Sequence, residues 1–492
     1  MPARKRVLPP ERLLRESKPV MFYALESRWL WVSIFLGVYA ALIALARTPA
    51  AAIVLLTPAL LLCVGWWICI GPANRWLLTF LCAAILLPPL PIALGDSGPH
   101  PCLLIAALGL IAGLLRPRDW RVPADALSRA ILILFFTLLA STALAAYYSG
   151  LPVAAGTLAR VLLLGISVYV FFYVTCGPGV PEWRATRTLF LAASASALFA
   201  CVDFYFQFPA PAGFGPQYVW LDSGVYRRAQ GLFYEASTLG NFCAFFLVMV
   251  SVALLRPKEQ GFVSRPALLC GAAFFSAALV LSYSRASLLN VAIAVATLLW
   301  LHRSRFRFRQ IGWLALPVIL AGAATTYYVF PLFTLHYWDR LSASATFLLS
   351  GTEGVLSGRL SSWQALVEFL LRNPAYALLG VGYKTLPYSN IAGQPVVGDN
   401  MYLTMLVETG VAGLGALLWL HVEILKSAYR SARHANPRVS FFGSWIFCFW
   451  MGQVFQMLSG DLLTYWRVLP LYFWALAVAV RSADEDSLPR SV

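Results

Sequence analysis

Acidic side chains stand at the start of, or inside, apolar segments of this chain. Asp399 directly precedes the run NMYLTMLVETG, and Glu408 lies about 12 Å farther along the same predicted helix. Glu235 opens a second apolar segment in the same way. A carboxylate in such a segment needs a polar cavity or a cationic partner, and it can accept a proton as a general base. We take Asp399 as the first candidate catalytic base, with Glu235 and Glu408 in reserve. The alternative for Asp399 is a simple helix N-cap.

Arginines lie close to these acidic segments. Arg285 lies in SYSRAS, a short turn between two apolar runs, and Arg359 lies in SGRLSSW. Arg227 and Arg228 come shortly before Glu235. Because guanidinium groups bind phosphate oxygens in bidentate fashion, we predict that these four arginines form a pyrophosphate site. The alternative for Arg285 is a side chain that snorkels to the membrane surface.

Polar and aromatic residues complete the predicted site. Four of them are candidates for binding the substrate or its sugars: Asn400, Trp363, Tyr383 and Lys384. Aromatic rings offer flat apolar surfaces to sugars, although Trp and Tyr also anchor proteins at membrane interfaces. The sequence contains no His/Cys spacing typical of metal ligands, no acidic cage and no glycine-rich phosphate loop. We therefore expect no metal ion and no cofactor.

Composition indicates a membrane protein. Hydrophobic residues make up 60% of the chain, charged residues only 12%, and the mean hydropathy is +0.73. Soluble domains carry roughly 25% charged residues. We predict an all-α polytopic membrane protein with about fourteen (twelve to fourteen) transmembrane helices, because apolar runs near the ~20 residues that cross a bilayer recur along the chain. They lie near 29–46, 51–70, 75–94, 101–115, 127–147, 153–175, 187–208, 231–255, 266–283, 286–301, 312–330, 400–425, 440–459 and 464–480.

Basic residues orient the predicted helices. Lys and Arg crowd the N-terminal segment and alternate predicted loops, and this bias places both termini in the cytoplasm. The net charge of +16 follows from this orientation, so we expect no nucleic-acid partner. Other cations fall on the predicted outer side, where they indicate an anionic ligand: Arg227, Arg228, Arg285, Arg359, Lys384 and Arg467. For Arg467 the alternative is an ion pair with Asp461.

Two predicted outer loops are longer than the other connections. The loop 209–230 is rich in Pro, Gly and aromatic residues, and the loop 331–399 contains a predicted amphipathic helix that follows Ser357 and ends at Asn373-Pro374. We predict one membrane domain with an external lid and an external working face. Its parts are a cytoplasmic segment 1–28, transmembrane helices over 29–330, the external loop 331–399, transmembrane helices over 400–480 and a cytoplasmic tail 481–492.

Several motifs occur in a defined order over roughly residues 225–470. They are GLFYEASTLGN at 231–241, the turn Ser284-Arg285, SGRLSSW followed by Asn373-Pro374 and Gly380-Val381-Gly382, and Asp399-Asn400 followed after nine residues by Gly410-Val-Ala-Gly413. In order and spacing they resemble the O-antigen ligase/polymerase superfamily of bacterial envelope glycosyltransferases, which includes Wzy-type polymerases and WaaL-type ligases. The first two hundred residues resemble this family only as a string of spans.

Two positions depart from the family pattern. Asp399 stands where the family has His, and Ala236 stands where it has Pro. The resemblance implies that the family's His activates the acceptor hydroxyl, and an aspartate in a dry site can do this when burial raises its pKa. The alternatives are that the base lies elsewhere or that Asp399 only orients the acceptor. The change from His favours a polymerase over a standard ligase.

The resemblance also implies a GT-C-like fold and a chemistry. We predict an inverting, metal-independent glycosyltransferase of the inner membrane that polymerises or transfers undecaprenyl-pyrophosphate-linked glycan on the periplasmic side. The acceptor is a glycan or lipid A-core, and a chain-length regulator is a further implied partner. The alternatives are an O-antigen ligase, a peptidoglycan polymerase of the shape-determination type and, from a different class, a lipid-linked-oligosaccharide transporter or flippase. The sequence shows no internal repeat of the kind common in transporters, which favours the enzyme.

Overall fold

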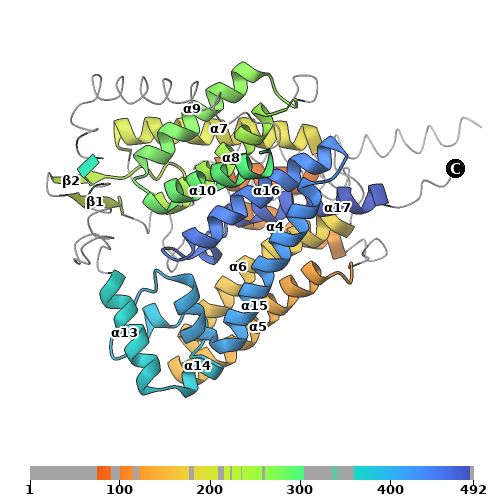
Figure 1. Ribbon diagram of the computed structural model, residues 1–492. Helices are drawn as coiled ribbons and strands as arrows, with labels where there is room; N and C mark the ends of the chain where they lie inside the picture. Colours follow the sequence, from red (N-terminus) through yellow and green to blue (C-terminus); the bar gives the residue numbers. More distant parts are fainter. Residues whose placement is uncertain are drawn as a thin grey trace, which may run out of the picture. The chain divides into compact units, whose positions relative to one another are not determined.

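The computed structural model describes a set of helices that belong to one compact unit, Pro72–Val492 (Figure 1). The described residues are 75–89, 100–114, 120, 122–176, 182–208, 215–221, 224–233, 235–256, 261–303, 335, 338–339, 342 and 359–487. Three predicted spans lie outside these residues, near 29–46, 51–70 and 312–330, and so does the predicted segment 1–28.

Helices dominate the described part of the chain. In order they are α3 (Arg75–Leu86), α4 (Cys102–Leu114), α5 (Ala126–Ser149), α6 (Leu151–Cys176), α7 (Glu182–Phe206), α8 (Ala236–Leu254), α9 (Arg265–Leu281), α10 (Arg285–Leu301), α13 (Arg359–Arg372), α14 (Ala375–Leu379), α15 (Met401–Ala432), α16 (Pro437–Gln456) and α17 (Leu469–Ser487). Two short 3₁₀ helices are η5 (Leu386–Tyr388) and η6 (Leu462–Thr464). The strands β1 (Tyr218–Leu221) and β2 (Gly224–Arg227) form an antiparallel hairpin.

Five of the described helices are long and apolar enough to cross a membrane: α5, α6, α7, α8 and α15. Shorter apolar helices are α3, α4, α9, α10 and the part of α17 over Leu469–Arg481. These features fit the predicted helical membrane protein. The full number of spans, about fourteen from the bilayer-length argument, stays a prediction.

The helix α8 occupies the centre of an aromatic core. Most of its residues are buried, and it packs against α9, α10 and α16. The ring of Phe245 lies 4.4 Å from that of Trp445, and Phe246 stacks on Phe275 at 5.4 Å. Such pairs contribute about 0.5–1.5 kcal/mol each beyond their buried area. This packing holds α8 against α9 and α16.

A buried amide cluster crosses the same core. Asn241 Nδ2 donates hydrogen bonds to Gln453 Oε1 at 2.6 Å and Gln456 Oε1 at 2.8 Å. Asn290 Nδ2 donates to the same two oxygens at 3.1 and 2.9 Å, and the Tyr472 hydroxyl donates to Asn241 Oδ1. Because no water competes for these groups in an apolar interior, the cluster holds α8, α10, α16 and α17 in one fixed arrangement.

The amphipathic helix predicted in the long loop is confirmed as α13. It ends at Arg372, directly before Asn373-Pro374. Leu366 and Phe369 form its buried face, and Phe369 stacks on Tyr376 of α14 with the ring centroids 5.3 Å apart. Figure 1 shows α13 and α14 beside the ends of α5 and α15.

A break in α15 receives the loop that follows α14. Gly410 has φ 68° and ψ −170°, which interrupts the helix and releases carbonyl groups of the preceding turn. The Val407 carbonyl accepts a hydrogen bond from Val381 N at 3.1 Å, and the Glu408 carbonyl accepts one from Gly382 N at 2.8 Å. The loop from residue 380 onward is therefore docked on the broken helix, with its next residues directed into the site described below.

Candidate active site

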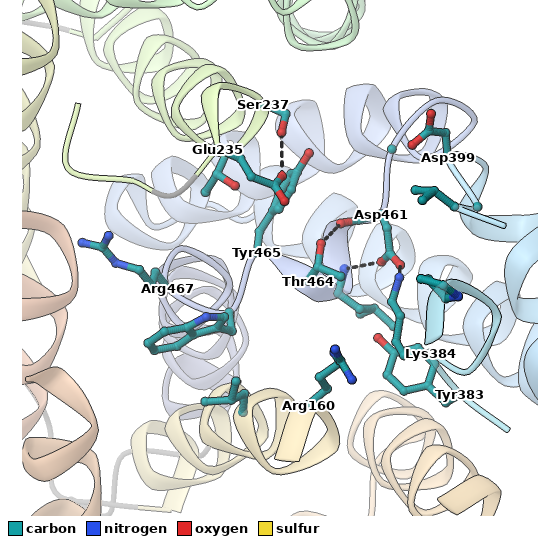
Figure 2. A pocket seen from close by; sticks show the side chains of 18 of the residues that line it. Arg160, Glu235, Ser237, Tyr383, Lys384, Asp399, Asp461, Thr464, Tyr465 and Arg467 are labelled. Atoms are coloured by element: carbon teal, nitrogen blue, oxygen red, sulfur yellow. Dashed lines mark hydrogen bonds and ion pairs between the residues drawn. The ribbon is translucent and has the colours of Figure 1, made fainter. Parts of the chain in front are cut away.

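Side chains from four parts of the chain meet in a cavity of about 330 Å³ (Figure 2). These parts are α6, the start of α8, the loop 380–399 and the connection between α16 and α17. The charged residues of the lining are Arg160, Glu235, Lys384, Asp399, Asp461 and Arg467. Its other polar and aromatic residues include Ser237, Tyr383, Tyr388, Thr464, Tyr465 and Trp466.

Lys384 and Asp461 form a buried ion pair in the cavity wall, through Nζ and Oδ2. Only 10% and 9% of their side chains are exposed. Lys384 has a φ of 56°, in the left-handed region that residues other than glycine adopt only when surrounding contacts impose it. Burial opposes the ammonium form, but the Asp461 and Glu408 carboxylates outweigh burial and raise the pKa of Lys384. Lys384 is therefore a fixed cation at neutral pH.

Tyr383 precedes Lys384 and is held through its backbone. Its N–H donates to Ser141 Oγ at 3.3 Å, and its carbonyl accepts from Thr157 Oγ1 at 2.8 Å. Burial, reinforced by the charge of Asp461, raises the pKa of Tyr383 well above its usual range. The phenol is therefore neutral, as a hydrogen-bond donor to an anion must be. Both residues of the predicted pair Tyr383 and Lys384 line the cavity.

Glu408 lies behind this wall and does not line the cavity. Its side chain is fully buried, and its Oε1 accepts a hydrogen bond from Leu386 N at 3.4 Å. The cation that it faces electrostatically is Lys384. Glu408 thus supports the loop through the Leu386 amide and lies outside the cavity lining.

Asn400, and not Asp399, caps α15. The side-chain oxygen of Asn400 accepts hydrogen bonds from Tyr402 N and Leu403 N, both at 3.1 Å. The alternative interpretation of Asp399 as the helix N-cap is therefore wrong by one position. Asp399 lines the cavity instead, whereas Asn400 is absent from its lining.

Glu235 reaches the cavity from the start of α8 (Figure 2). Its Oε2 accepts a hydrogen bond from Ser237 Oγ at 2.8 Å. It stands beside Tyr465, whose pKa is raised by burial and next by the Glu235 charge. The cavity therefore holds two of the three predicted catalytic carboxylates, Glu235 and Asp399.

Three of the arginines predicted to bind pyrophosphate do not line the cavity: Arg227, Arg228 and Arg285. Arg227 Nη2 lies 3.4 Å from Asp203 Oδ1, and these two largely buried charges compensate each other. Arg228 Nε donates to the Ser282 carbonyl at 2.8 Å, in the turn just before Arg285. Arg227 thus links β2 to α7, and Arg228 links the segment after β2 to the α9–α10 turn. The role of all three arginines as phosphate ligands stays a prediction.

The helix α13 carries two further predicted site residues. Arg359 is its first residue, and the side chain of Arg359 lies outside the described part of the chain. Trp363 is partly buried and is not among the cavity residues. The structure does not bring these two residues to the cavity, and their functional roles remain predictions.

Arg160 is a site residue that sequence reasoning missed. It lies within α6, and its guanidinium carbon stands 4.4 Å from the centre of the Tyr388 ring. A guanidinium group over an aromatic ring keeps its positive charge, while the ring shields one of its faces from water. The signal was present in the sequence, because Arg160 is the one charged residue of LPVAAGTLARVLLLGISVYVFFYVTC and charges in such segments are usually functional.

The predicted ion pair between Arg467 and Asp461 is wrong. Arg467 donates to the Ala84 carbonyl at 3.1 Å through Nε, to the Leu87 carbonyl at 2.9 Å through Nη2, and to the Leu232 carbonyl through Nη1. The first two are at and just past the C-terminal end of α3, where the helix dipole favours a cation. Arg467 thus ties α3 to the segment before Glu235, and Asp461 pairs with Lys384 instead.

The cavity combines proton acceptors with fixed cations. Glu235 and Asp399 can each take a proton from a hydroxyl group, whereas Asp461 is engaged by Lys384. Arg160 and Lys384 supply positive charge to an anion. Figure 2 shows Arg160 across the cavity from Glu235, and Lys384 beside Asp461. The described residues contain no group of three or more His, Cys, Asp or Glu that could hold a metal ion.

Residues 270–418 match the family described as O-antigen ligase. This segment runs from α9 through the loop 380–399 into α15, so it contributes Tyr383, Lys384 and Asp399 to the cavity. No curated protein matches the chain in sequence.

Proposed function

We propose that the chain is a membrane glycosyltransferase of the O-antigen ligase/polymerase type, which moves a lipid-linked glycan onto an acceptor hydroxyl. The match of residues 270–418 to the O-antigen ligase family supports this proposal. The donor is a glycan on undecaprenyl pyrophosphate, and the reaction polymerises repeat units of an O-antigen or exopolysaccharide. The observation that supports this most is the cavity, which gathers carboxylates and cations from four parts of the chain.

Asp399 is the proposed base. Its carboxylate takes the proton of the acceptor hydroxyl while the oxygen attacks the anomeric carbon of the donor. The bond from that carbon to the pyrophosphate oxygen breaks with inversion, and undecaprenyl pyrophosphate leaves. Glu235 is the second candidate, because it lines the same cavity. Glu408 is a weaker candidate, because it is fully buried behind the cavity wall.

Arg160 and Lys384 are the proposed partners of the pyrophosphate. Charge develops on the leaving oxygen, and preorganised cations stabilise it without reorganisation at the moment of reaction. Both cations line the cavity, unlike Arg227, Arg228 and Arg285. They supply charge that a metal ion would otherwise supply, so the proposed reaction is metal-independent.

The proposal includes a location and an architecture. The bias of basic residues toward alternate predicted loops supports an inner-membrane protein with cytoplasmic termini and a periplasmic site. About fourteen spans in a GT-C-like arrangement, and a chain-length regulator as partner, belong to this proposal as well.

Transfer to lipid A-core is the second candidate function. The description of the matching family as O-antigen ligase favours it. The aspartate at position 399, where the family has His, favours the polymerase. The two functions differ only in the acceptor, so one assay separates them.

The assay uses the purified protein in detergent with lipid-linked repeat units, with and without lipid A-core. We expect long-chain products from the donor alone, and a loss of about 10²-fold or more in Asp399→Asn, the range for removal of a general base. Glu368→Gln is the matched control, because this carboxylate lies on α13 with 62% of its side chain exposed. Products that require lipid A-core would establish the ligase, and unchanged turnover in Asp399→Asn would exclude Asp399 as the base.

A further inference from the structure

Glu235 has the backbone of a helix cap but does not act as one. Its φ of −127° and ψ of 140° are those of an N-cap residue at the start of α8. In that position a side-chain oxygen normally accepts a hydrogen bond from an amide of the first turn. The carboxylate of Glu235 makes no such bond and lines the cavity instead.

Gln217 provides an acceptor at this helix end. Its Oε1 accepts a hydrogen bond from Ala236 N, the first amide of α8, at 2.9 Å. Ala236 is fully buried, so water cannot take over this role. Gln217 belongs to the segment just before β1, 19 positions before Ala236 in the sequence.

The backbone of Gln217 is fixed on both sides. Its N–H donates to Gln230 Oε1 at 3.1 Å, and its carbonyl accepts from Arg228 N at 2.8 Å. The segment that follows β2 is anchored in turn, because Ala229 N donates to the Leu281 carbonyl at 2.9 Å. The acceptor therefore stands in place before any ligand binds.

We propose that Gln217 is a positioning residue. By accepting the hydrogen bond of the buried Ala236 amide, it fixes the backbone at the start of α8 and thereby holds the neighbouring Glu235 carboxylate in the cavity. Without the Gln217 oxygen, this buried amide lacks an acceptor, so the start of α8 shifts and the Glu235 carboxylate moves with it. The position of the segment before β1 thus controls a group of the site. This inference rests on the part of the proposed function in which Glu235, the second candidate base, takes part in proton transfer.

The functional test is a double-mutant cycle between Gln217 and Glu235, measured as kcat/KM on lipid-linked repeat units in detergent. Gln217→Met keeps the size of the side chain and removes the acceptor. We expect Glu235→Gln to lower kcat/KM about 10²-fold, as for loss of a proton-transfer group, and Gln217→Met to lower it about tenfold through part of the same loss. In the Glu235→Gln background, Gln217→Met should change kcat/KM less than about twofold, because coupled residues are non-additive.

The same cycle separates the possible failures. A tenfold loss from Gln217→Met that persists in Glu235→Gln would overturn the inference, because Gln217 would then act independently of Glu235. Wild-type turnover in Glu235→Gln would remove Glu235 from the proposed function and, with it, the functional role of Gln217. Gln364→Met is the matched control on the exposed face of α13, and it should leave kcat/KM unchanged.

Hydrogen exchange tests the hydrogen bond from Ala236 N to Gln217 Oε1 directly and requires no turnover. Protection of the Ala236 amide should be reduced in Gln217→Met and retained in Gln217→Glu, which preserves an acceptor oxygen at the same reach. Gln217→Glu should also recover turnover relative to Gln217→Met. Full protection of Ala236 in Gln217→Met would overturn the inference, because the hydrogen bond would then not depend on Gln217.

Discussion

Two buried cations line the cavity, Arg467 and Lys384, and the groups that neutralise or solvate their charges differ. Arg467 is satisfied by backbone carbonyls, which cannot move away or change protonation. Lys384 is satisfied by a carboxylate on another segment, Asp461. An ion pair can exchange its anion for a phosphate oxygen, whereas the contacts of Arg467 belong to the scaffold. This difference supports the proposed role of Lys384 as a ligand of the pyrophosphate and favours a structural role for Arg467.

Removal of Lys384 should therefore destabilise the protein. Lys384→Met leaves the Asp461 carboxylate buried and uncompensated, a change that typically costs about 3–5 kcal/mol. The double variant Lys384→Met/Asp461→Asn should recover part of this loss, because both charges are then removed. Denaturant unfolding in detergent measures the difference. Turnover should stay low in both variants, since both lack the ammonium group proposed to bind pyrophosphate.

The pair Lys426 and Glu423 provides the control. Their side-chain atoms lie 2.9 Å apart, but 54% of the Lys426 side chain is exposed. Lys426→Met should cost at most about 1 kcal/mol. Equal losses from the two Lys→Met variants would contradict the structural role of the Lys384 pair.

Because the pKa of Lys384 is raised, the contribution of the ion pair to stability should be complete at neutral pH. It should decline only as the pH rises through that raised value.

The break in α15 explains why glycines recur on both sides of the contact between the loop and the helix. A Cβ at Gly410 would lie 2.2 Å from the Leu378 carbonyl oxygen, and one at Gly380 would lie 2.4 Å from the Glu408 oxygen. Both glycines also have positive φ. The close backbone approach, and with it the position of Tyr383 and Lys384, depends on the absence of these side chains.

Gly410→Ala should disturb this contact. The substitution meets both the Leu378 backbone and an unfavourable φ of 68°, so we expect a lower unfolding midpoint and a loss of turnover of about tenfold or more, since an ~1 Å displacement of a site can cost 10²-fold. Gly415→Ala is the control in the same helix, where a Cβ would meet nothing within 4 Å. It should be neutral or stabilising by up to about 1 kcal/mol. Similar effects of the two changes would argue against the docking role of Gly410.

Elements specified by local chemistry were predictable from the sequence. The end of α13 before Asn373-Pro374 follows from the restriction that proline places on the preceding residue. The start of α10 follows Ser284, where the apolar run resumes. The cap of α15 was displaced by one residue, because Asp399 and Asn400 are both good caps and the sequence does not distinguish them.

The site was less predictable, because tertiary contacts decide which charges meet. Tyr383, Lys384, Asp399 and Glu235 were predicted to be site residues, and the structure brings all four to one cavity. Their pairing was not predictable: the partner of Asp461 is Lys384, because the loop docked on the broken helix delivers that cation. No local pattern encodes a contact between segments so distant in the sequence.

A group of hydrogen bonds around the Leu87 carbonyl, made by His100 and Arg467 and called the polar knot below, joins the first and last parts of the described chain. His100 Nε2 donates to the Leu87 carbonyl at 3.0 Å, and the same carbonyl accepts from Arg467. His100 Nδ1 accepts from Cys102 N at 3.2 Å, so the ring is neutral in this arrangement. Burial, and next the Arg467 charge, lowers the pKa of His100 to about 4. The knot connects α3, α4 and the segment before α17, and acid should loosen it.

The direction of this effect follows from proton binding. Between the ordinary His value of 6.5 and about 4, the unfolded chain binds a proton at His100 and the folded protein does not. This contribution to stability is therefore complete above pH 6.5 and decreases as the pH falls toward 4. His100→Gln removes the titration and retains a donor for the Leu87 carbonyl, so its unfolding midpoint should fall less than that of the wild type over this range. His434→Gln, outside the knot, should follow the wild-type slope, and the same slope in His100→Gln would mean that the knot does not set the acid sensitivity.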